Sequence, residues 1–362
     1  MQSWITFLEH QGARDIDAQT LAIGGFGEHG GSTTPPVTNF MTPLTHFGLI
    51  TATGEDAAHF LHNQLTNDVE KLDTGHARLA GYCTPKGRLM ATFLLWKSVD
   101  SVLLQLPRQL QPAIQKRLQM FIMRSKVKLA DRGDDLVQIG LVGPAATAAL
   151  GAWFPVLPDA PYAKVDTEAG SLIRLADTGD VGDPAAAGVV RYVWVTDPQT
   201  AQSAWPRLAI TLQPAGASAW QLTEVRAGIP LVTAATQEQF VPQMINFEAV
   251  GGVNFQKGCY PGQEIVARSQ YLGKLKRRMM PATVIAADVA AGTEVFSSAD
   301  PDQACGMVVN AAAMTPDATA CLVEIKLAAL ESTVHLGAID GPLLTFHALP
   351  YALADADRPD LR

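Results

Sequence analysis

The chain has few charged residues for its length. Of its 362 residues, only 17% are Asp, Glu, Lys or Arg, whereas 48% are hydrophobic. Such a composition is typical of a well-packed globular protein and excludes an intrinsically disordered chain. Because one hydrophobic core usually serves no more than about 250 to 300 residues, we expect two or three domains.

Cysteine is scarce as well. The four cysteines, Cys83, Cys259, Cys305 and Cys321, are too few and too scattered for a disulfide scaffold, and no two form a Cys-x-x-Cys pair. None of the eight histidines lies at metal-ligand spacing to Cys259. The sequence therefore predicts no permanently bound zinc or iron-sulfur centre.

Long apolar runs and an excess of positive charge are also absent. No apolar stretch approaches the roughly 18 residues needed to cross a bilayer, and the amino-terminal residues resemble neither a secretory signal nor a mitochondrial presequence. The net charge of −8 argues against a surface that coats nucleic acid, and the basic residues between Lys274 and Arg278 are typical of a solvated face. We expect a cytoplasmic protein that contacts neither a membrane nor nucleic acid directly. The sequence leaves its oligomeric state open, with a monomer favoured.

The pattern of turns and apolar residues predicts an α+β protein with an arm and three lobes. Glycine and proline are concentrated in residues 24–39, so 1–39 should form an N-terminal arm and linker. From Ser101 onwards, the order strand, helix, strand, strand, helix, strand predicts a ferredoxin-like second lobe over about 101–214.

The remaining residues supply the first and third lobes. A hairpin over Gly81 to Val99 and an amphipathic helix from Ala217 place the first lobe at about 40–100 and 215–277. Short β-like runs separated by turns predict a small C-terminal β-barrel over 278–362.

One segment combines more reactive chemistry than any other. Residues 256 to 268 read Gln-Lys-Gly-Cys-Tyr-Pro-Gly-Gln-Glu-Ile-Val-Ala-Arg. Proline favours the first position of a helix, so Pro261 predicts a helix that runs towards Tyr271. Cys259 would then lie at the amino end of that helix, where unpaired N–H groups and the ammonium of Lys257 stabilise a thiolate. The alternative is a Gly/Pro turn around a buried structural thiol.

Several segments together resemble the folate-binding YgfZ family, whose members are related to the T-protein (aminomethyltransferase) of the glycine cleavage system. The most specific is Lys257-Gly-Cys-Tyr-Pro-Gly-Gln-Glu264, and residues 60–68, 85–88 and 224–230 support it. The resemblance implies a three-lobed aminomethyltransferase-like fold whose central cavity holds tetrahydrofolate or a one-carbon derivative. It also implies a role in assembling or repairing iron-sulfur clusters in client proteins, including enzymes that thiolate tRNA.

A folate needs stacking area for its pterin, polar groups for the pterin edge and a cation for its glutamate tail. Arg226 could bind the tail, although an ion pair with Glu224 or Glu248 is an equal alternative. Trp220 could stack on the pterin, although a packed core tryptophan is more common.

Further candidates come from the segments that carry the resemblance. Asn63, Gln64 and Asp68 could line the cavity from the first lobe, although such residues at a helix end are more often caps. The Lys-Gly-Cys-Tyr segment would form the rim of the cavity, with these side chains towards the folate: Tyr260, Gln263 and Glu264.

The segment Lys86-Gly-Arg-Leu-Met-Ala-Thr92 departs from T-protein, because it has no acid where aminomethyltransferases carry a catalytic aspartate. Aminomethyl transfer needs a group that manages protons on the folate nitrogen. We therefore expect a folate-binding factor with Cys259 as an accessible functional thiol and Lys257 beside it. The thiol could ligate iron, exchange with another thiol or react with a one-carbon unit. Two alternatives are a folate-dependent one-carbon transferase and a non-catalytic adaptor stabilised by folate.

A cysteine nucleophile usually needs a histidine base. No histidine lies within 70 residues of Cys259 in the sequence. The histidines of the first lobe stand in no recognisable motif, which favours surface or capping roles for His46, His59, His62 and His76.

Overall fold

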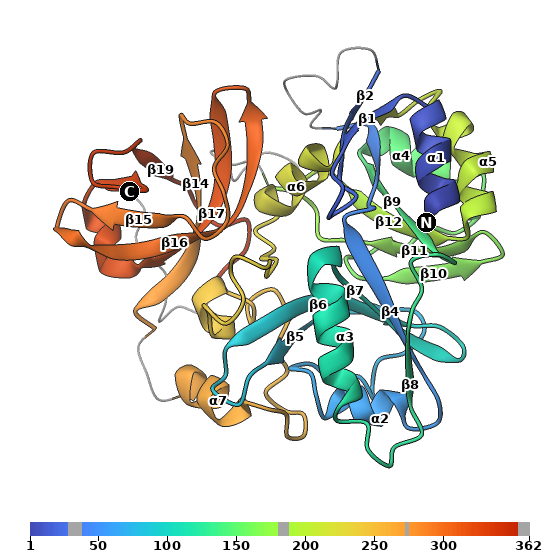
Figure 1. Ribbon diagram of the computed structural model, residues 1–362, viewed down its shortest axis with the longest axis horizontal. Helices are drawn as coiled ribbons and strands as arrows, with labels where there is room; N and C mark the ends of the chain where they lie inside the picture. Colours follow the sequence, from blue (N-terminus) through green and yellow to red (C-terminus); the bar gives the residue numbers. More distant parts are fainter. Residues whose placement is uncertain (28–37, 180–187, 272–274, 354–362) are drawn as a thin grey trace.

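Three lobes meet around a central helix, α6 (Ala217–Arg226), in the computed structural model (Figure 1). The structure describes residues 1–27, 38–179, 188–271 and 275–353. Helix α6 packs against the barrel on one side and against strands of the second lobe on the other. Side chains from both ends of the chain and from its middle therefore converge on this helix.

The first lobe is built on a five-stranded antiparallel sheet with the order β5-β6-β7-β4-β8. Every residue of the longest strand is buried except Lys97, because both faces of the sheet are covered. Helix α3 crosses one face, with Ile114 and Leu118 buried beneath it. In chain order the elements are β4 (Phe47–Thr53), α2 (Ala57–His62), β5 (Ala77–Cys83), β6 (Leu89–Lys97), β7 (Ser101–Pro107), the 3-10 helix η1 (Arg108–Leu110), α3 (Gln111–Gln119) and β8 (Lys128–Asp131).

The second lobe contains a six-stranded sheet with the order β10-β11-β12-β9-β3-β13. Its last helix begins after Asp197, whose carboxylate accepts hydrogen bonds from the N–H groups of Gln199 and Thr200, and Pro198 occupies the first turn. In chain order the elements are β3 (Phe40–Pro43), β9 (Val137–Val142), α4 (Pro144–Leu150), β10 (Lys164–Thr167), β11 (Gly170–Arg174), β12 (Arg191–Thr196), α5 (Pro198–Leu208) and β13 (Gln213–Pro214).

The two sheets repeat one topology. Strands β6, β7, β4 and β8 stand in the same order as β11, β12, β9 and β13, except that β3 is inserted between the last two. Helices α2 and α3 occur at the same points of the chain order as α4 and α5. Each lobe is thus a ferredoxin-like unit with an added edge strand, β5 or β10.

The predicted boundary near residue 100 does not match the sheets. Strands β7 and β8, which the sequence assigned to the second lobe, pair directly with β4 in the first. The ferredoxin-like order of the second lobe starts at Val137 instead. Because the same order of elements occurs twice in succession, the prediction combined the end of one unit with the start of the next.

The third lobe is a six-stranded antiparallel sheet with the order β18-β15-β16-β17-β14-β19. A bridge between His335 and Leu343 brings its two edges together, so the sheet approaches a closed barrel. Its interior contains a separate hydrophobic cluster that includes Cys305 and Cys321. The elements are β14 (Arg277–Val284), β15 (Glu294–Ser297), β16 (Asp300–Thr315), β17 (Ala318–Lys326), the 3-10 helix η3 (Leu327–Glu331), β18 (Val334–Leu336) and β19 (Leu344–Phe346).

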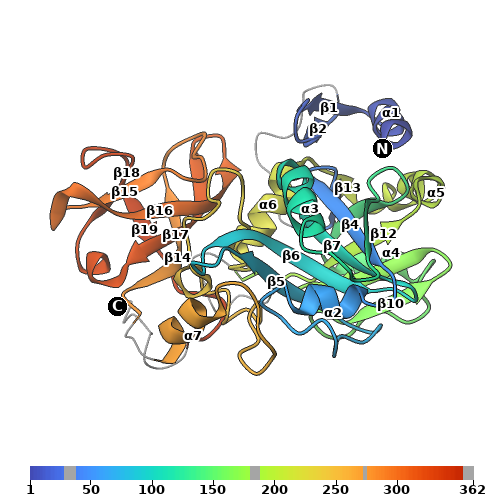
Figure 2. The same ribbon diagram turned by 60° about the horizontal axis from the view of Figure 1, so that its bottom comes forward.

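The N-terminal arm packs on the second lobe, at the rim of the molecule (Figure 2). It contains α1 (Gln2–His10) and a hairpin of β1 (Ala13–Ile16) and β2 (Ile23–Phe26). Trp4 is fully buried, with its ring 5.7 Å from that of Trp205 on α5. The middle of the predicted linker, residues 28–37, lies outside the described residues.

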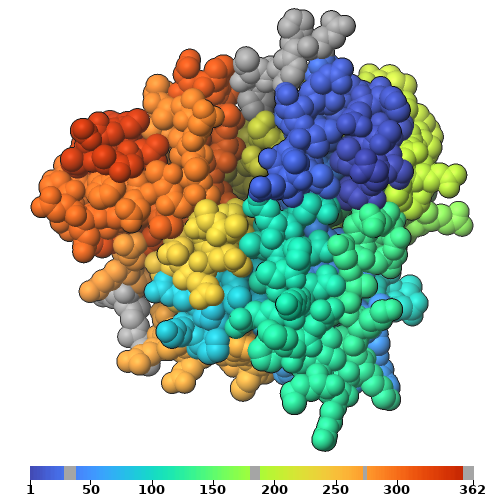
Figure 3. Space-filling view, viewed as in Figure 1, coloured from blue at the N-terminus to red at the C-terminus, as the bar shows by residue number. Residues whose placement is uncertain are grey.

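The segment that joins the lobes covers the space between them. On the face shown in Figure 3, the yellow residues after α6 lie between the barrel and the first lobe. This segment includes the 3-10 helix η2 (Pro242–Ile245) and leads to α7 (Gln263–Tyr271). Within the described residues, no helix has the length and apolarity needed to span a membrane.

Candidate functional site

The segments that carry the family resemblance are joined by hydrogen bonds around Thr66. Its hydroxyl donates to the carbonyl oxygen of Gly252 at 2.6 Å and accepts from the N–H of Gly81 at 2.7 Å. Its carbonyl oxygen accepts from the N–H of Asn254 at 2.9 Å. One buried threonine therefore fixes the α2 segment, strand β5 and the Gly-Gly-Val-Asn segment to one another.

The hairpin turn between β5 and β6 packs directly against the loop that carries Cys259 (residues 257–262, the cysteine loop). Gly262 has φ +82°, and a Cβ atom there would lie 2.4 Å from the carbonyl oxygen of Thr84 and 2.7 Å from Gly87. Gly87 also has positive φ, +70°, and packs against Ile265 of α7. These two glycines are needed because the two turns touch backbone to backbone.

Helix α7 begins later than the sequence predicted. It starts at Gln263, and the left-handed Gly262 separates it from Pro261. Cys259 is exposed in the loop before the helix and does not occupy its first turn. Cys83, Cys305 and Cys321 are buried, and burial raises the pKa of Cys83 and of Cys321 to about 12. Among the four cysteines, Cys259 is the one open to solvent.

Lys257 holds the loop onto the end of α2. Its ammonium donates hydrogen bonds to the carbonyl oxygens of His62, Leu65 and Gly258, at 2.5, 3.1 and 3.1 Å. It also lies 4.7 Å from the centre of the Tyr260 ring. Burial lowers the pKa of Lys257 to about 8, against the opposing effects of Asp68 and Cys259. The side chain is thus a buried cation that caps a helix C-terminus as well as a neighbour of the thiol.

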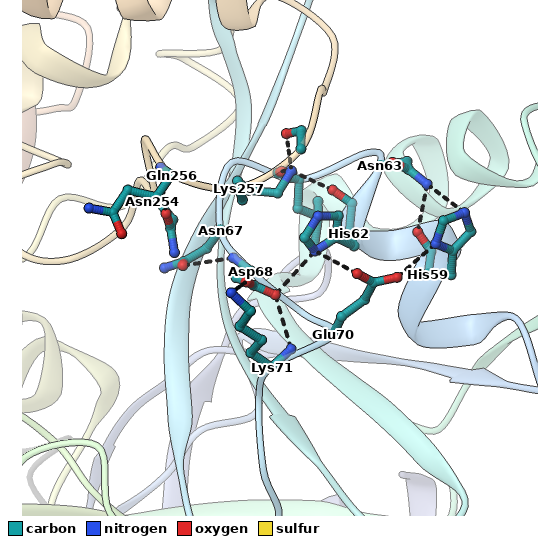
Figure 4. A network of polar contacts seen from close by, with 12 residues as sticks. His59, His62, Asn63, Asn67, Asp68, Glu70, Lys71, Asn254, Gln256 and Lys257 are labelled. Carbon is teal, nitrogen blue, oxygen red and sulfur yellow. Dashed lines mark hydrogen bonds and ion pairs between the residues drawn. The ribbon is translucent and has the colours of Figure 1, made fainter.

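A chain of histidines and carboxylates lies beside this loop (Figure 4). His62 Nδ1 lies 3.1 Å from Asp68 Oδ1 and 3.9 Å from Glu70 Oε2. Glu70 in turn contacts His59 Nδ1 at 2.7 Å. Burial would raise the pKa of Asp68, but the Lys71 N–H and His62 outweigh it and hold that pKa below its usual value. Asp68 is therefore an ionised partner for His62.

A central cavity lies where the lobes meet α6. One part has a volume of about 40 Å³ and is walled by the first two lobes, and a neighbouring part of about 190 Å³ extends to the barrel. Phe47, Glu224 and Leu231 line both parts. Each part is smaller than the roughly 300 Å³ at which pockets for drug-sized ligands begin.

A buried ion pair forms the polar wall of this cavity. Arg191 is fully buried and donates hydrogen bonds to Thr223 Oγ1 at 3.0 Å and to Glu224 Oε1 at 3.1 Å. Its guanidinium lies 5.6 Å from the centre of the Trp220 ring. Burial raises the pKa of Glu224, and Arg191 opposes that rise. The cavity thus presents a carboxyl group that resists ionisation more than an exposed glutamate does.

His46 lines the larger part of the cavity opposite the same helix. Neither of its ring nitrogens, both buried, has a hydrogen-bond partner among the described residues. Burial, together with the charge of Arg108, lowers the pKa of His46 to about 4. An imidazole with unsatisfied nitrogens beside a cavity is a group that a ligand or water can satisfy.

A wider cleft of about 530 Å³ lies next to the central cavity, beside the segment that leads to the cysteine loop. Leu79 and Tyr162 line both spaces, so the two are adjacent. The polar side chains of the cleft are Asn67, Arg78, Asn254 and Gln256, and its aromatic ones include Phe255 and Tyr271.

The structure separates the predicted folate ligands. Trp220 lines the cavity but is 1% exposed and packs against Gly140. Arg226 lies two positions after Glu224, about 200° further round the helix, and is not among the residues that line these spaces. Asn63 follows α2 and donates to the His59 carbonyl oxygen at 3.0 Å, as a capping residue does.

The other predicted residues gather at the cysteine loop. Asp68 binds His62 rather than lining the cavity, and the buried Oε1 atom of Gln64 has no hydrogen-bond partner among the described residues. Tyr260 is buried under Lys257, while Gln263 and Glu264 begin α7.

Sequence reasoning missed the polar cavity groups His46, Arg191 and Glu224. The basic run after α7 also proved to be partly internal, since Arg278 is 1% exposed and contacts Glu248. The pairing of Arg191 with Glu224 joins distant segments, so it becomes visible only in the folded chain. The segment 224–230 pointed to Arg226 instead, and no local motif surrounds His46 or Arg191.

The whole fold is similar to a solved aminomethyltransferase. The glycine cleavage system aminomethyltransferase T from Bartonella henselae superposes with a TM-score of 0.76 over 96% of each chain, at 16% sequence identity. The family described as GCVT N-terminal domain matches residues 40–176. These two findings define an aminomethyltransferase-like fold.

Curated relatives narrow the class to one family. The chain is 30% identical to the tRNA-modifying protein YgfZ of Klebsiella pneumoniae over 86% of its length and 93% of the relative. It is 33% identical to the proteins of the same name from Photorhabdus laumondii, covering 71% of that protein, and Colwellia psychrerythraea, covering 70%. The chain belongs to the YgfZ family.

Proposed function

We propose that this protein binds tetrahydrofolate, or a one-carbon derivative of it, between its lobes and presents Cys259 to client proteins. The clients would be iron-sulfur proteins or their assembly machinery, in the cytoplasm, and would include enzymes that thiolate tRNA. The names of the relatives support a role in tRNA modification. We infer an indirect role, because Arg277 and Arg278 of the basic run are paired with Glu324 and Glu248 inside the protein.

The observation that carries the folate proposal is the buried polar wall of the central cavity. A pterin offers adjacent N–H donors that match a carboxylate, and Glu224, whose Oε1 lies 3.1 Å from Arg191, lines the cavity. His46 lines the same space, and its two buried ring nitrogens have no hydrogen-bond partner within the part of the chain that the structure describes. These groups fit a flat ligand with donors and acceptors along its edge.

The tail of the ligand would extend into the wider cleft. Leu79 and Tyr162 line both spaces, and Arg78 supplies a cation on the cleft wall for a carboxylate. Because the inner cavity is narrow, binding requires the lobes to move apart, and the ligand would then connect all three. Tetrahydrofolate should therefore raise the thermal unfolding temperature. No shift at a saturating concentration would contradict the proposal.

The proposed role of Cys259 is tested in cells that lack the native protein. Cys259→Ser should fail to restore the activity of a cluster-dependent tRNA-thiolating enzyme, whereas the buried-cysteine control Cys83→Ser should restore it if folded. Full restoration by Cys259→Ser would show that the protein acts as an adaptor whose thiol is dispensable.

One observation favours a second candidate, a folate-dependent one-carbon transferase. The segment Lys86 to Thr92 lacks the acidic residue that aminomethyltransferases carry there. Glu224, however, supplies a buried carboxyl group with a raised pKa at the cavity. Turnover of methylenetetrahydrofolate with an amine donor, lost in Glu224→Gln, would establish this activity. A negative result across donors would exclude it.

A further inference from the structure

We propose that the loop after helix α3 (residues 120–127, the α3 loop) is the surface on which client proteins dock, and that it binds acidic proteins through an apolar side chain among their carboxylates. This inference rests on the proposed function, since it names the chemistry of the clients to which Cys259 is presented. The α3 loop belongs to neither the folate cavity nor the cysteine loop, so its role is a separate one.

The α3 loop exposes three large apolar side chains. Met120, Phe121 and Met123 are 64%, 46% and 90% exposed, and nowhere else in the described residues do four consecutive positions expose three such side chains. Ile122, between them, is partly buried and packs against the main hydrophobic core. The loop therefore turns one apolar side chain inwards and leaves three in solvent, which is typical of a surface for protein interaction.

Backbone contacts with the residues before α2 fix the α3 loop at its base. The Asp56 carboxylate accepts a hydrogen bond from the N–H of Lys126 at 2.7 Å, and the Lys126 ammonium pairs with Glu55. A Cβ atom on Gly54, whose φ is +107°, would lie 2.1 Å from the carbonyl oxygen of Lys126. Met123 has φ +45°, a conformation that is costly for a residue other than glycine. The exposed side chains thus stand on a backbone held by specific packing.

The charge along α3 and its loop is positive. Residues 108–130 contain six Lys or Arg residues and no Asp or Glu, although the whole chain has a net charge of −8. The two acidic residues that contact the loop are already bound by Lys126. Lys116, Arg124 and Lys128 are exposed and form no ion pair with any residue that the structure describes. These three cations complement a partner with carboxylates on its surface.

The apolar side chains favour a protein partner over a nucleic acid. Phosphate groups would engage the cations alone and would leave the two methionines in water. Methionine is unbranched and adapts to partners of different shape, and exposed methionines are typical of surfaces that bind several proteins. The α3 loop therefore fits a set of acidic client proteins rather than a single exact partner.

Helix α2 relates the α3 loop to the thiol. The loop binds the residues before α2, and Lys257 binds the carbonyl oxygen of His62 at the other end of the helix. The six residues of α2 span about 9 Å. Figure 1 shows α2 and the end of α3 close together at the lower edge of the first lobe. Because a small domain is about 30 Å across, a client on the α3 loop can also reach Cys259.

Fluorescence anisotropy with labelled peptides tests this surface on the full chain. The probe is a synthetic peptide in which a central Leu-Phe pair is flanked by glutamates. Two comparison peptides replace the glutamates by lysines or the Leu-Phe pair by serines. We expect the probe to bind about tenfold more tightly than either comparison peptide, and its binding to weaken as salt is added. No binding of the probe, or equal binding of the three peptides, would overturn the proposal.

Two substitutions assign the binding to the α3 loop. Arg124→Glu should weaken binding of the probe by about tenfold and Met123→Ser by about fivefold, because each removes one part of the match. The control is Ile210→Ser, since Ile210 is 80% exposed in the second lobe, and it should bind as the wild type does. Circular dichroism checks that each variant folds. Wild-type affinity in both folded variants contradicts the assignment, and the comparison of peptides decides even if a variant does not fold.

A mixed-sequence single-stranded RNA serves as the competing ligand. It should not displace the probe from the wild type at equal concentration. If the RNA binds more tightly than the probe and loses its affinity in Arg124→Glu, the loop is a nucleic-acid surface and the proposal is wrong.

Complementation separates this inference from the proposed function. In cells that lack the native protein, Arg124→Glu should restore the tRNA-thiolating enzyme poorly and Ile210→Ser should restore it fully. Full restoration by Arg124→Glu would show that clients do not dock on the α3 loop, whatever Cys259 does. Peptide binding needs neither folate nor the thiol, so full complementation by Cys259→Ser would remove the proposed thiol role while leaving the measured docking intact.

Discussion

The Lys257 ammonium lies 2.5 Å from the carbonyl oxygen of His62, and this contact joins the cysteine loop to the end of α2. The lysine that the sequence suggested as an activator of Cys259 is therefore also a structural group. The Lys257 ammonium interacts electrostatically with Cys259, and its hydrogen bonds attach the cysteine loop to the residues at the end of α2. Loss of function on replacing Lys257 would not by itself show a chemical role.

Lys257→Met should lower the free energy of unfolding by about 2 kcal/mol, because buried carbonyl oxygens of His62 and Leu65 lose their donor. Urea unfolding measures this change. Lys71→Met is the matched control, since Lys71 is 83% exposed and 4.0 Å from Asp68, and should change stability by less than about 0.5 kcal/mol. An unchanged stability in Lys257→Met would mean that the ammonium does not support the loop.

His46 should make the protein sensitive to mild acid. Its pKa is about 4 in the folded protein against 6.5 as its ordinary value, so between these values the unfolded chain binds the proton more tightly. This contribution to stability is present above about pH 6.5 and is lost as the pH falls towards 4. By pH 5 the stability lost through this group amounts to about 2 kcal/mol.

The His46 contribution is measured by comparing thermal or urea unfolding at pH 7 and pH 5. His46→Phe should lose less stability than the wild type over this range, whereas a substitution of the exposed His10 should behave as wild type. An identical pH dependence in His46→Phe would show that His46 is protonated in the folded protein. Bound folate should also reduce the acid sensitivity if it contacts the ring.

The packing of the two turns can be tested with a pair of glycines. Gly262 and Gly251 have nearly the same φ, +82° and +79°, but a Cβ atom at Gly251 meets no atom within 4 Å. Gly251→Ala should cost about 1 to 2 kcal/mol for the left-handed backbone alone. Gly262→Ala should cost clearly more in urea unfolding, because its Cβ also collides with Thr84 and Gly87. Equal losses would show that the turns are not in contact.

Much of the fold could be predicted, because its elements have strong local signals. The hairpin turn before Arg88, the helix that starts at Pro198 and the barrel strands all lie where turns and apolar patterns indicated. The boundary between the first two lobes could not, since their repeated topology makes the grouping of β7 ambiguous until strand pairing is known.

The site was predictable only where the chemistry is local. Cys259 was found from its neighbours in sequence, and the structure places it in solvent. Arg226 was predicted as a folate ligand from its sequence motif. On α6, however, it is Glu224, two positions earlier, that lines the cavity. His46 lies in the turn between β3 and β4 and Arg191 begins β12, so their roles depend on tertiary packing that no single segment encodes.

The central claim is that tetrahydrofolate binds between the lobes at Glu224. Isothermal titration calorimetry with tetrahydrofolate measures it directly, using the wild type, Glu224→Gln and, as a control on the barrel, the exposed Glu331→Gln. We predict saturable binding by the wild type and the control, and an affinity reduced at least tenfold in Glu224→Gln, since a charge-assisted hydrogen bond contributes about 1.5 to 3 kcal/mol. Absence of binding, or equal affinity in Glu224→Gln, would contradict the account.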